Sequence, residues 1–123
     1  MAKTILVADD SRMFRQLEEN MLCEQGYRLI HAADGAEAVR LARSEGPDLV
    51  LMDVQMPVMD GNKALSILKK SERTCHIPVL MLTAEAGPRD RQRMAELGAT
   101  GVLAKPVSKS DLLQAVRSAI GDA

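Results

Sequence analysis

The chain of 123 residues has the length of one domain, and we expect a single domain over residues 1–123. Hydrophobic residues make up 46% of the chain and charged residues 27%, which predicts a globular protein with an aliphatic core. A net charge of −1 argues against electrostatic recruitment of nucleic acid or of an anionic membrane. With one Phe and one Tyr in all, the chain also lacks aromatic side chains on which the bases of a single strand could stack.

The two cysteines and the N-terminal segment bear on location. Cys23 and Cys75 are isolated thiols without metal-ligand spacing, and we expect both to be reduced and partly buried. The apolar run near the N-terminus is too short for a signal-peptide core or a membrane span. These features favour a cytoplasmic protein that does not associate with a membrane.

Short apolar runs alternate with helical patterns along the chain. Strands are expected at Thr4–Ala8, Arg28–Ala32, 48–52, 78–82 and Gly101–Ala104. Helices are expected from Ser11 to about Gln25, between Asp34 and Gly46, after Gly61, over 89–97 and from Ser108 onward. Ser11, Asp34 and Ser108 are good N-cap residues, and an acidic residue follows the last two in capping-box position.

This alternation predicts an α/β fold, a doubly wound sandwich around a parallel sheet. Ligands of such sheets bind beyond the carboxyl ends of the strands, where the strand order reverses. Four of the apolar runs end in polar residues, namely Asp9-Asp10, Asp53, Thr83 and Lys105. We therefore expect these side chains to share one edge of the sheet.

The three carboxylates at this edge predict a bound cation. Two unit charges about 4 Å apart repel by ~4 kcal/mol at an effective dielectric of 20, so the cluster needs a proton or a cation. Carboxylate oxygens suit Mg²⁺, with Mn²⁺ as a second choice. With Lys105 and Thr83 nearby, the group has the character of a phosphoryl site in which Asp53 acts as the nucleophile.

Each of these residues also has a more ordinary role open to it. A single Asp after a strand is usually a turn residue or a helix cap. The placement of several such polar residues at the same ends of successive strands is what favours a phosphoryl site. A small phosphatase with an aspartate nucleophile is the alternative enzyme, but that class separates its two aspartates by one residue, whereas Asp9 and Asp10 are adjacent. A carrier of flavin phosphate is the alternative binding protein, and the chain lacks the aromatic residues to cover a flavin.

The quoted residues carry a family resemblance. Asp9-Asp10, the run from Asp53 to Gly61, Thr83-Ala84 and Lys105-Pro106 resemble, in order and spacing, the receiver domain of two-component response regulators, the CheY-like family. The resemblance covers the whole chain. It implies a flavodoxin-like (βα)5 fold whose five parallel strands are ordered 2-1-3-4-5.

The resemblance also implies a role for each site residue. Asp53 is the expected phosphoacceptor, and Mg²⁺ is expected on Asp9, Asp10, Asp53 and the backbone carbonyl of Gln55. Thr83 is expected to contact the phosphoryl group after transfer and Lys105 to pair with it. Lys105-Pro106 is expected to be a cis peptide, and Ala84 belongs to the switch segment with Thr83.

The implied function is a phosphorylation-activated signalling switch, not a turnover enzyme on a small substrate. The chain would take a phosphoryl group from a phosphohistidine on a sensor histidine kinase or a phosphotransfer protein, catalyse its own dephosphorylation, and act by binding a downstream protein. No output domain is visible in the sequence, so the chain either acts alone or is a receiver piece of a larger hybrid kinase or regulator. A degenerate receiver that binds partners without phosphorylation is disfavoured because every site residue is present.

Three features leave the mode of output open. Val102 stands where the family often has an aromatic residue that reports the hydroxyl's movement, so we expect backbone shifts after Thr83 to reach the output face instead. Arg89, Arg91 and Arg93 are either a solvated helix face or a docking surface. Met56, Met59 and the first helix either dock a partner or fill space beneath a loop.

Overall fold

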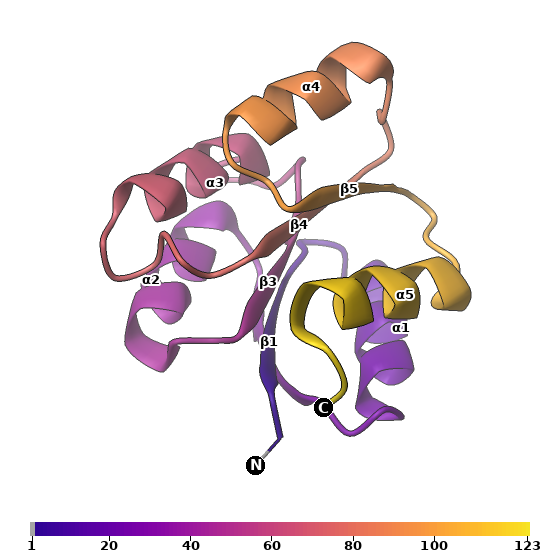
Figure 1. The fold of residues 1–123 in the computed structure, drawn as a ribbon. Helices are drawn as coiled ribbons and strands as arrows, with labels where there is room; N and C mark the ends of the chain where they lie inside the picture. Colours follow the sequence, from indigo (N-terminus) through magenta and orange to yellow (C-terminus); the bar gives the residue numbers. More distant parts are fainter. Residues whose placement is uncertain (1) are drawn as a thin grey trace.

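A five-stranded sheet runs through the computed structural model, which describes residues 2–123 (Figure 1). All neighbouring strands pair in parallel in the order β2-β1-β3-β4-β5, as the resemblance implied. The strands are β1 (Thr4–Ala8), β2 (Arg28–Ala32), β3 (Leu49–Asp53), β4 (Val79–Thr83) and β5 (Gly101–Ala104). Met1, the first residue of the expected domain, lies outside the described residues.

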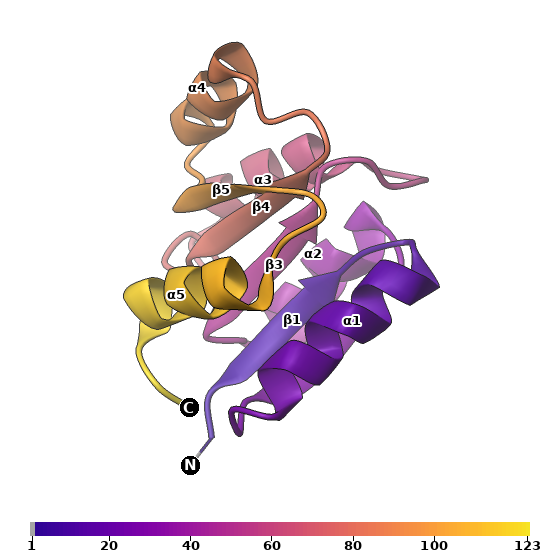
Figure 2. The same cartoon turned by 90° about the vertical axis from the view of Figure 1, so that its right-hand side faces the viewer.

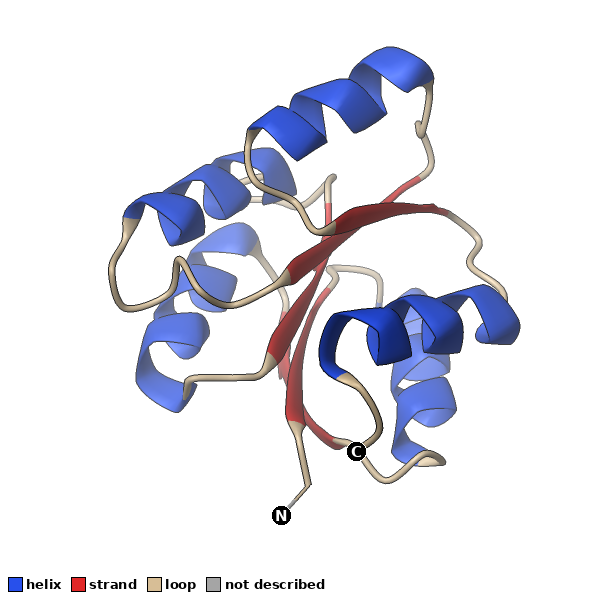
Figure 3. Cartoon of the chain, in the orientation of Figure 1, coloured by secondary structure: helices blue, strands red, loops and turns tan. Residues whose placement is uncertain are grey.

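Helices cover both faces of the sheet, which confirms the doubly wound prediction (Figure 3). They are α1 (Arg12–Cys23), α2 (Gly35–Glu45), α3 (Gly61–Lys70), α4 (Pro88–Glu96) and α5 (Lys109–Ile120). One core cluster joins the sheet to α2, α3 and Met94 of α4, and a second joins its other face to α1 and α5. Figure 2 shows α1 and α5 together on one side of the sheet and α2 and α3 behind it.

Side-chain caps explain where four of the helices begin. The predicted caps are formed, because Ser11, Asp34 and Ser108 each accept a hydrogen bond from the backbone N–H three residues on. Asp60 does the same for Lys63 at 2.8 Å and begins α3. Helix α4 has no side-chain cap and begins with Pro88 after Gly87, where the missing proline N–H costs nothing.

The central strands are buried on both faces, as near-continuous apolar runs predict. Strands β3 and β4 each begin and end one residue later than predicted, so Asp53 and Thr83 are the last residues of their strands instead of the first residues of loops. Both side chains are consequently buried and fixed by the sheet. Within residues 2–123, no helix combines the length and apolar character that crossing a bilayer requires.

Some predicted burials were wrong. Cys23 and Cys75 are both exposed, because Cys23 ends α1 on its outer side and Cys75 lies in the surface connection between α3 and β4. Met56 is buried and Met59 packs against the core, so these two methionines fill space beneath the β3–α3 loop.

Gly61 holds the β3–α3 loop against the end of β3. Its N–H donates a hydrogen bond to the Val54 carbonyl at 2.7 Å. A Cβ atom at this position would lie 2.1 Å from the Asp53 carbonyl oxygen, far inside van der Waals contact. Any side chain here therefore has to displace the backbone of Asp53.

We expect Gly61→Ala to lower the free energy of unfolding by about 1–3 kcal/mol, measured by urea denaturation, because the added methyl overpacks this contact. Gly87→Ala is the matched control, since its Cβ would meet no atom closer than 3.6 Å. Equal losses in the two variants would contradict the close approach.

Candidate functional site

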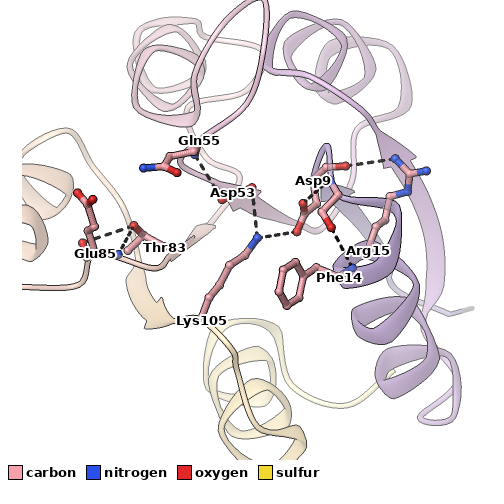
Figure 4. A network of polar contacts seen from close by, with 9 residues as sticks. Asp9, Phe14, Arg15, Asp53, Gln55, Thr83, Glu85 and Lys105 are labelled. Carbon is pink, nitrogen blue, oxygen red and sulfur yellow. Dashed lines mark hydrogen bonds and ion pairs between the residues drawn. The ribbon is translucent and has the colours of Figure 1, made fainter.

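An open cleft lies at the carboxyl edge of the sheet, where the strand order reverses beside β1 (Figure 4). Its volume is about 700 Å³. The lining comes from the first turn of α1 and the segments that follow β3, β4 and β5, and it includes Asp10, Asp53, Gln55, Ala84 and Lys105. The fold thus places the predicted polar residues at one edge, as parallel strands require.

Three carboxylates meet in this cleft. Asp9, Asp10 and Asp53 each offer an oxygen within 4.8 Å of the others. Asp9 is fully buried and its Oδ1 accepts a hydrogen bond from the Ser11 N–H at 2.9 Å, whereas Asp10 is exposed. Burial raises the pKa of Asp53; Lys105 lowers it in part, and the Asp9 charge raises it further.

Lys105 spans the cleft and neutralises part of this charge. Its ammonium lies 2.9 Å from Asp9 Oδ2 and 3.2 Å from Asp53 Oδ2. It also lies 4.9 Å from the centre of the Phe14 ring, within the range of a cation–π contact. Burial opposes the ammonium charge, but the hydrogen bond to Asp9 and the charge of Asp53 outweigh it, so the pKa of Lys105 is raised.

The donor set fits a hard divalent cation. One ammonium faces three carboxylates whose oxygens lie within 4.8 Å of one another, so the cluster keeps an excess of negative charge. All the side-chain donors are oxygens, and the exposed Asp10 leaves the cluster open to water. These are the properties of a Mg²⁺ site that retains water ligands. Gln55 lines the same cleft and donates its N–H to Asp53 Oδ1 at 3.3 Å.

Thr83 lies next to Lys105, whose backbone N–H donates to the Thr83 carbonyl at 2.9 Å, but its hydroxyl is turned to another partner. Its Oγ1 accepts a hydrogen bond from the Glu85 N–H at 3.0 Å and donates to the Glu85 carbonyl at 3.4 Å. In Figure 4 the hydroxyl faces Glu85, while the Lys105 side chain lies between Thr83 and Asp9 and points to Asp53. Thr83 lines a separate cavity of about 150 Å³ with Val54 and Gln55. The Lys105–Pro106 peptide is cis, as the resemblance implied.

Glu18 is a neighbour of the site that was not predicted from the sequence. It lies on the inward side of α1, four residues after Phe14, and only 3% of it is exposed. Burial raises the pKa of Glu18 to about 8, the Asp9 charge adds to this, and Lys105 opposes it. The signal in the sequence was an acid four residues from both Phe14 and Leu22, at an inward position of an amphipathic helix.

The raised pKa of Glu18 makes stability depend on pH. Its ordinary value is 4.5, so between about pH 5 and 8 the folded chain holds a proton that the unfolded chain has released, and stability falls as pH rises. We expect Glu18→Gln to gain roughly 3 kcal/mol relative to the wild type between pH 5 and pH 8.5, measured by urea denaturation in metal-free buffer. Glu19→Gln is the control and should follow the wild type. A gap between Glu18→Gln and wild type that does not change with pH would refute the assignment.

Known proteins resemble this chain in sequence and in fold. The sequence profile of the response regulator receiver domain matches residues 5–117. The polar-differentiation response regulator DivK of Brucella ovis is 34% identical over 123 residues, covering 100% of both chains. The chemotaxis protein CheY4 of Vibrio cholerae superposes with a TM-score of 0.91 at 34% identity, over 97% of this chain and 99% of that one.

A further solved structure bears on the acidic cluster. The receiver domain of sensor histidine kinase PA1611 from Pseudomonas aeruginosa superposes with a TM-score of 0.90 at 34% identity, over 99% of this chain and 100% of that one. That protein coordinates a magnesium ion in its active-site cleft. The phosphatase alternative is not favoured by any of these similarities. The chain belongs to the response regulator receiver domain family, and it is a signalling switch of two-component systems.

Proposed function

We propose that the Asp53 carboxylate of this chain accepts a phosphoryl group from a phosphohistidine on a sensor histidine kinase or a phosphotransfer protein. The observation that carries this proposal is the Lys105 ammonium between Asp9 and Asp53, at the mouth of a cleft with three carboxylates. This contact places a positive charge next to the Asp53 oxygen that would attack phosphorus, where it can stabilise the negative charge of the phosphoryl oxygens. The source of the phosphoryl group is a partner, since neither His31 nor His76 lines the cleft.

The chemistry needs positioning more than covalent assistance. As the Asp53 oxygen forms its bond to phosphorus, the P–N bond of the phosphohistidine breaks and its electron pair stays on the imidazole nitrogen. The sheet holds Asp53 in place, and Gln55 fixes one of its oxygens through a backbone hydrogen bond. Lys105 lies close enough to contact an oxygen of the phosphoryl group. Later attack of water on phosphorus restores the carboxylate.

Mg²⁺ fits the same residues. We propose that Asp9, Asp10, Asp53 and the Gln55 backbone carbonyl hold it, with Mn²⁺ as a substitute. When bound, it supplies positive charge that offsets the charge of the phosphoryl oxygens. Hydrogen bonds from the backbone N–H groups of Ser11 and Gln55 already hold the Asp9 and Asp53 carboxylates in position. These two carboxylates therefore need little reorganisation when the cation binds.

The partner has to cover the rim of the cleft for its histidine to reach Asp53. Met13 and Leu17 of α1 are 64% and 47% exposed, unusual values for large apolar side chains. Met13 precedes Phe14, which lines the cleft, and Leu17 lines a smaller cavity next to it. We propose that these two side chains contact the helix that carries the partner's phosphohistidine.

The structure suggests how the signal leaves the site without an aromatic residue at Val102. To reach a phosphoryl group, Thr83 Oγ1 has to release the Glu85 backbone. The next residue, Ala86, accepts a hydrogen bond from Arg91 Nε at 2.9 Å, and the same guanidinium donates to the Val102 carbonyl at 3.0 Å. We propose that Arg91 couples movement of the Thr83–Ala86 segment to β5. Of the arginines Arg89, Arg91 and Arg93, this one therefore has a role inside the domain.

The phosphoacceptor is tested by mass spectrometry after incubation with acetyl phosphate and Mg²⁺. We expect one phosphoryl group on the wild type and none on Asp53→Asn, because the amide is not a nucleophile for phosphorus. Asp60→Asn, at the rim of the same cleft, is the matched control and should be labelled. Labelling of Asp53→Asn, or none on the wild type with either Mg²⁺ or Mn²⁺, would overturn the proposal.

The Arg91 coupling is tested by the backbone amide resonances of Thr83–Ala86 and Val102 when beryllofluoride and Mg²⁺ are added as a phosphoryl mimic. We expect Arg91→Ala to keep the shifts of the first segment and to lose at least about half of the Val102 shift, since only the bridge is removed. Arg89→Ala, an exposed arginine on the same helix, should resemble the wild type. An undiminished Val102 shift in Arg91→Ala would exclude the bridge.

A further inference from the structure

Glu18 is a buried acid that the proposed chemistry leaves without a role. Among residues 2–123 it is the one buried carboxyl besides Asp9 and Asp53. It lies on the inward side of α1, where burial raises its pKa and the charges of Asp9, Lys105 and Asp53 also act on it. Apolar residues surround this part of α1, so an aliphatic side chain would be the ordinary choice at this position.

One oxygen of Glu18 has no partner. Its Oε1 is buried without a hydrogen bond, although buried acceptors are nearly always satisfied. A small cavity of about 40 Å³ lies next to it and is also lined by Phe14, Lys105 and Pro106. The rest of its lining is apolar, from Leu17, Met21 and Val107. The residue with the unpaired acceptor and the residue with three N–H donors thus line the same small cavity.

Lys105 stands between this cavity and the cleft. Lys105 and Phe14 line both of them. The ammonium contacts Asp9 and Asp53, the same carboxylates that are proposed to bind Mg²⁺. A divalent cation and an ammonium on the same oxygens repel each other strongly at such distances. The ammonium therefore has to withdraw from Asp9 when the cation binds, and it needs another acceptor.

We propose that Glu18 is a positioning residue that receives the Lys105 ammonium when a divalent cation occupies Asp9. This inference rests on the proposed function. The unpaired Oε1 accepts one N–H of the ammonium, which already lies 4.9 Å from the centre of the Phe14 ring. Lys105 then stays at the mouth of the cleft instead of extending into solvent, and it remains available to a phosphoryl group on Asp53. Glu18 thus lowers the cost of moving the lysine and strengthens cation binding.

A double-mutant cycle with Lys105 tests this role through Mg²⁺ affinity, measured without a phosphodonor by titrating the amide resonances of Asp10 and Val54. We expect Glu18→Leu to weaken Mg²⁺ binding about tenfold in the wild-type background and less than about twofold beside Lys105→Met, since no ammonium then has to move. Glu18→Gln should recover most of the affinity, because its amide oxygen still accepts a hydrogen bond. Glu19→Leu, a surface acid one residue on, is the control and should bind Mg²⁺ like the wild type.

A second readout follows the lysine itself. On addition of Mg²⁺, the Lys105 side-chain ¹³Cε resonance should shift in the wild type and in Glu18→Gln towards a hydrogen-bonded position, and in Glu18→Leu towards the value of a solvent-exposed lysine. Urea denaturation of each variant shows that it is folded, and Glu18→Met, which also lacks the acceptor, replaces Glu18→Leu in the cycle if the leucine variant does not fold.

The outcomes separate this inference from the proposed function. If Glu18→Leu loses the same Mg²⁺ affinity with and without Lys105, Glu18 acts on the carboxylates directly. If Glu18→Leu binds Mg²⁺ as the wild type does, Glu18 has no role in cation binding. Either result overturns the inference and leaves the proposed phosphorylation of Asp53 standing. Failure of the wild type to bind Mg²⁺ or Mn²⁺ overturns both.

Discussion

The contact of the Lys105 ammonium with Asp9 and Asp53 is the interaction on which the rest of the site depends. Three carboxylates whose oxygens lie within 4.8 Å of one another repel, and burial of two of them makes the repulsion stronger. One cation of the chain reduces this repulsion without removing it. The remaining negative charge is the property on which the proposed cation site and phosphoryl chemistry rest.

Rigid and adjustable parts meet at this contact. Asp9 and Asp53 are held by strands, by the Ser11 and Gln55 amides and by the tight approach of Gly61, so they change little. Lys105 and Thr83 have alternative partners: the lysine shares a cavity with the unpaired Glu18, and the threonine hydroxyl is bound to the Glu85 backbone. Under the proposed function, a phosphoryl group on Asp53 would change which partners are favoured, which is how a local charge biases a two-state switch.

The site also carries a cost in stability. Glu18 occupies an inward helical position where an apolar residue would pack without desolvating a carboxyl, and its raised pKa records that cost. The same residue brings an acceptor close to Lys105. Proteins commonly keep a destabilising group, such as this buried carboxyl, close to a functional site at the expense of stability. The exposed Met13 and Leu17 contribute little buried area to the fold, which is consistent with the partner contact proposed for them.

The amino-acid sequence by itself determined the order of elements, the parallel α/β fold and the gathering of Asp9, Asp10, Asp53 and Lys105, because strand alternation and right-handed crossovers place all strand ends at one edge. It did not reveal the one-residue shift of β3 and β4, which register with neighbouring strands decides. Tertiary structure alone turned Thr83 towards Glu85, exposed both cysteines and enclosed Glu18. Side-chain direction and burial depend on packing between segments distant in sequence, and local patterns carry little information about either.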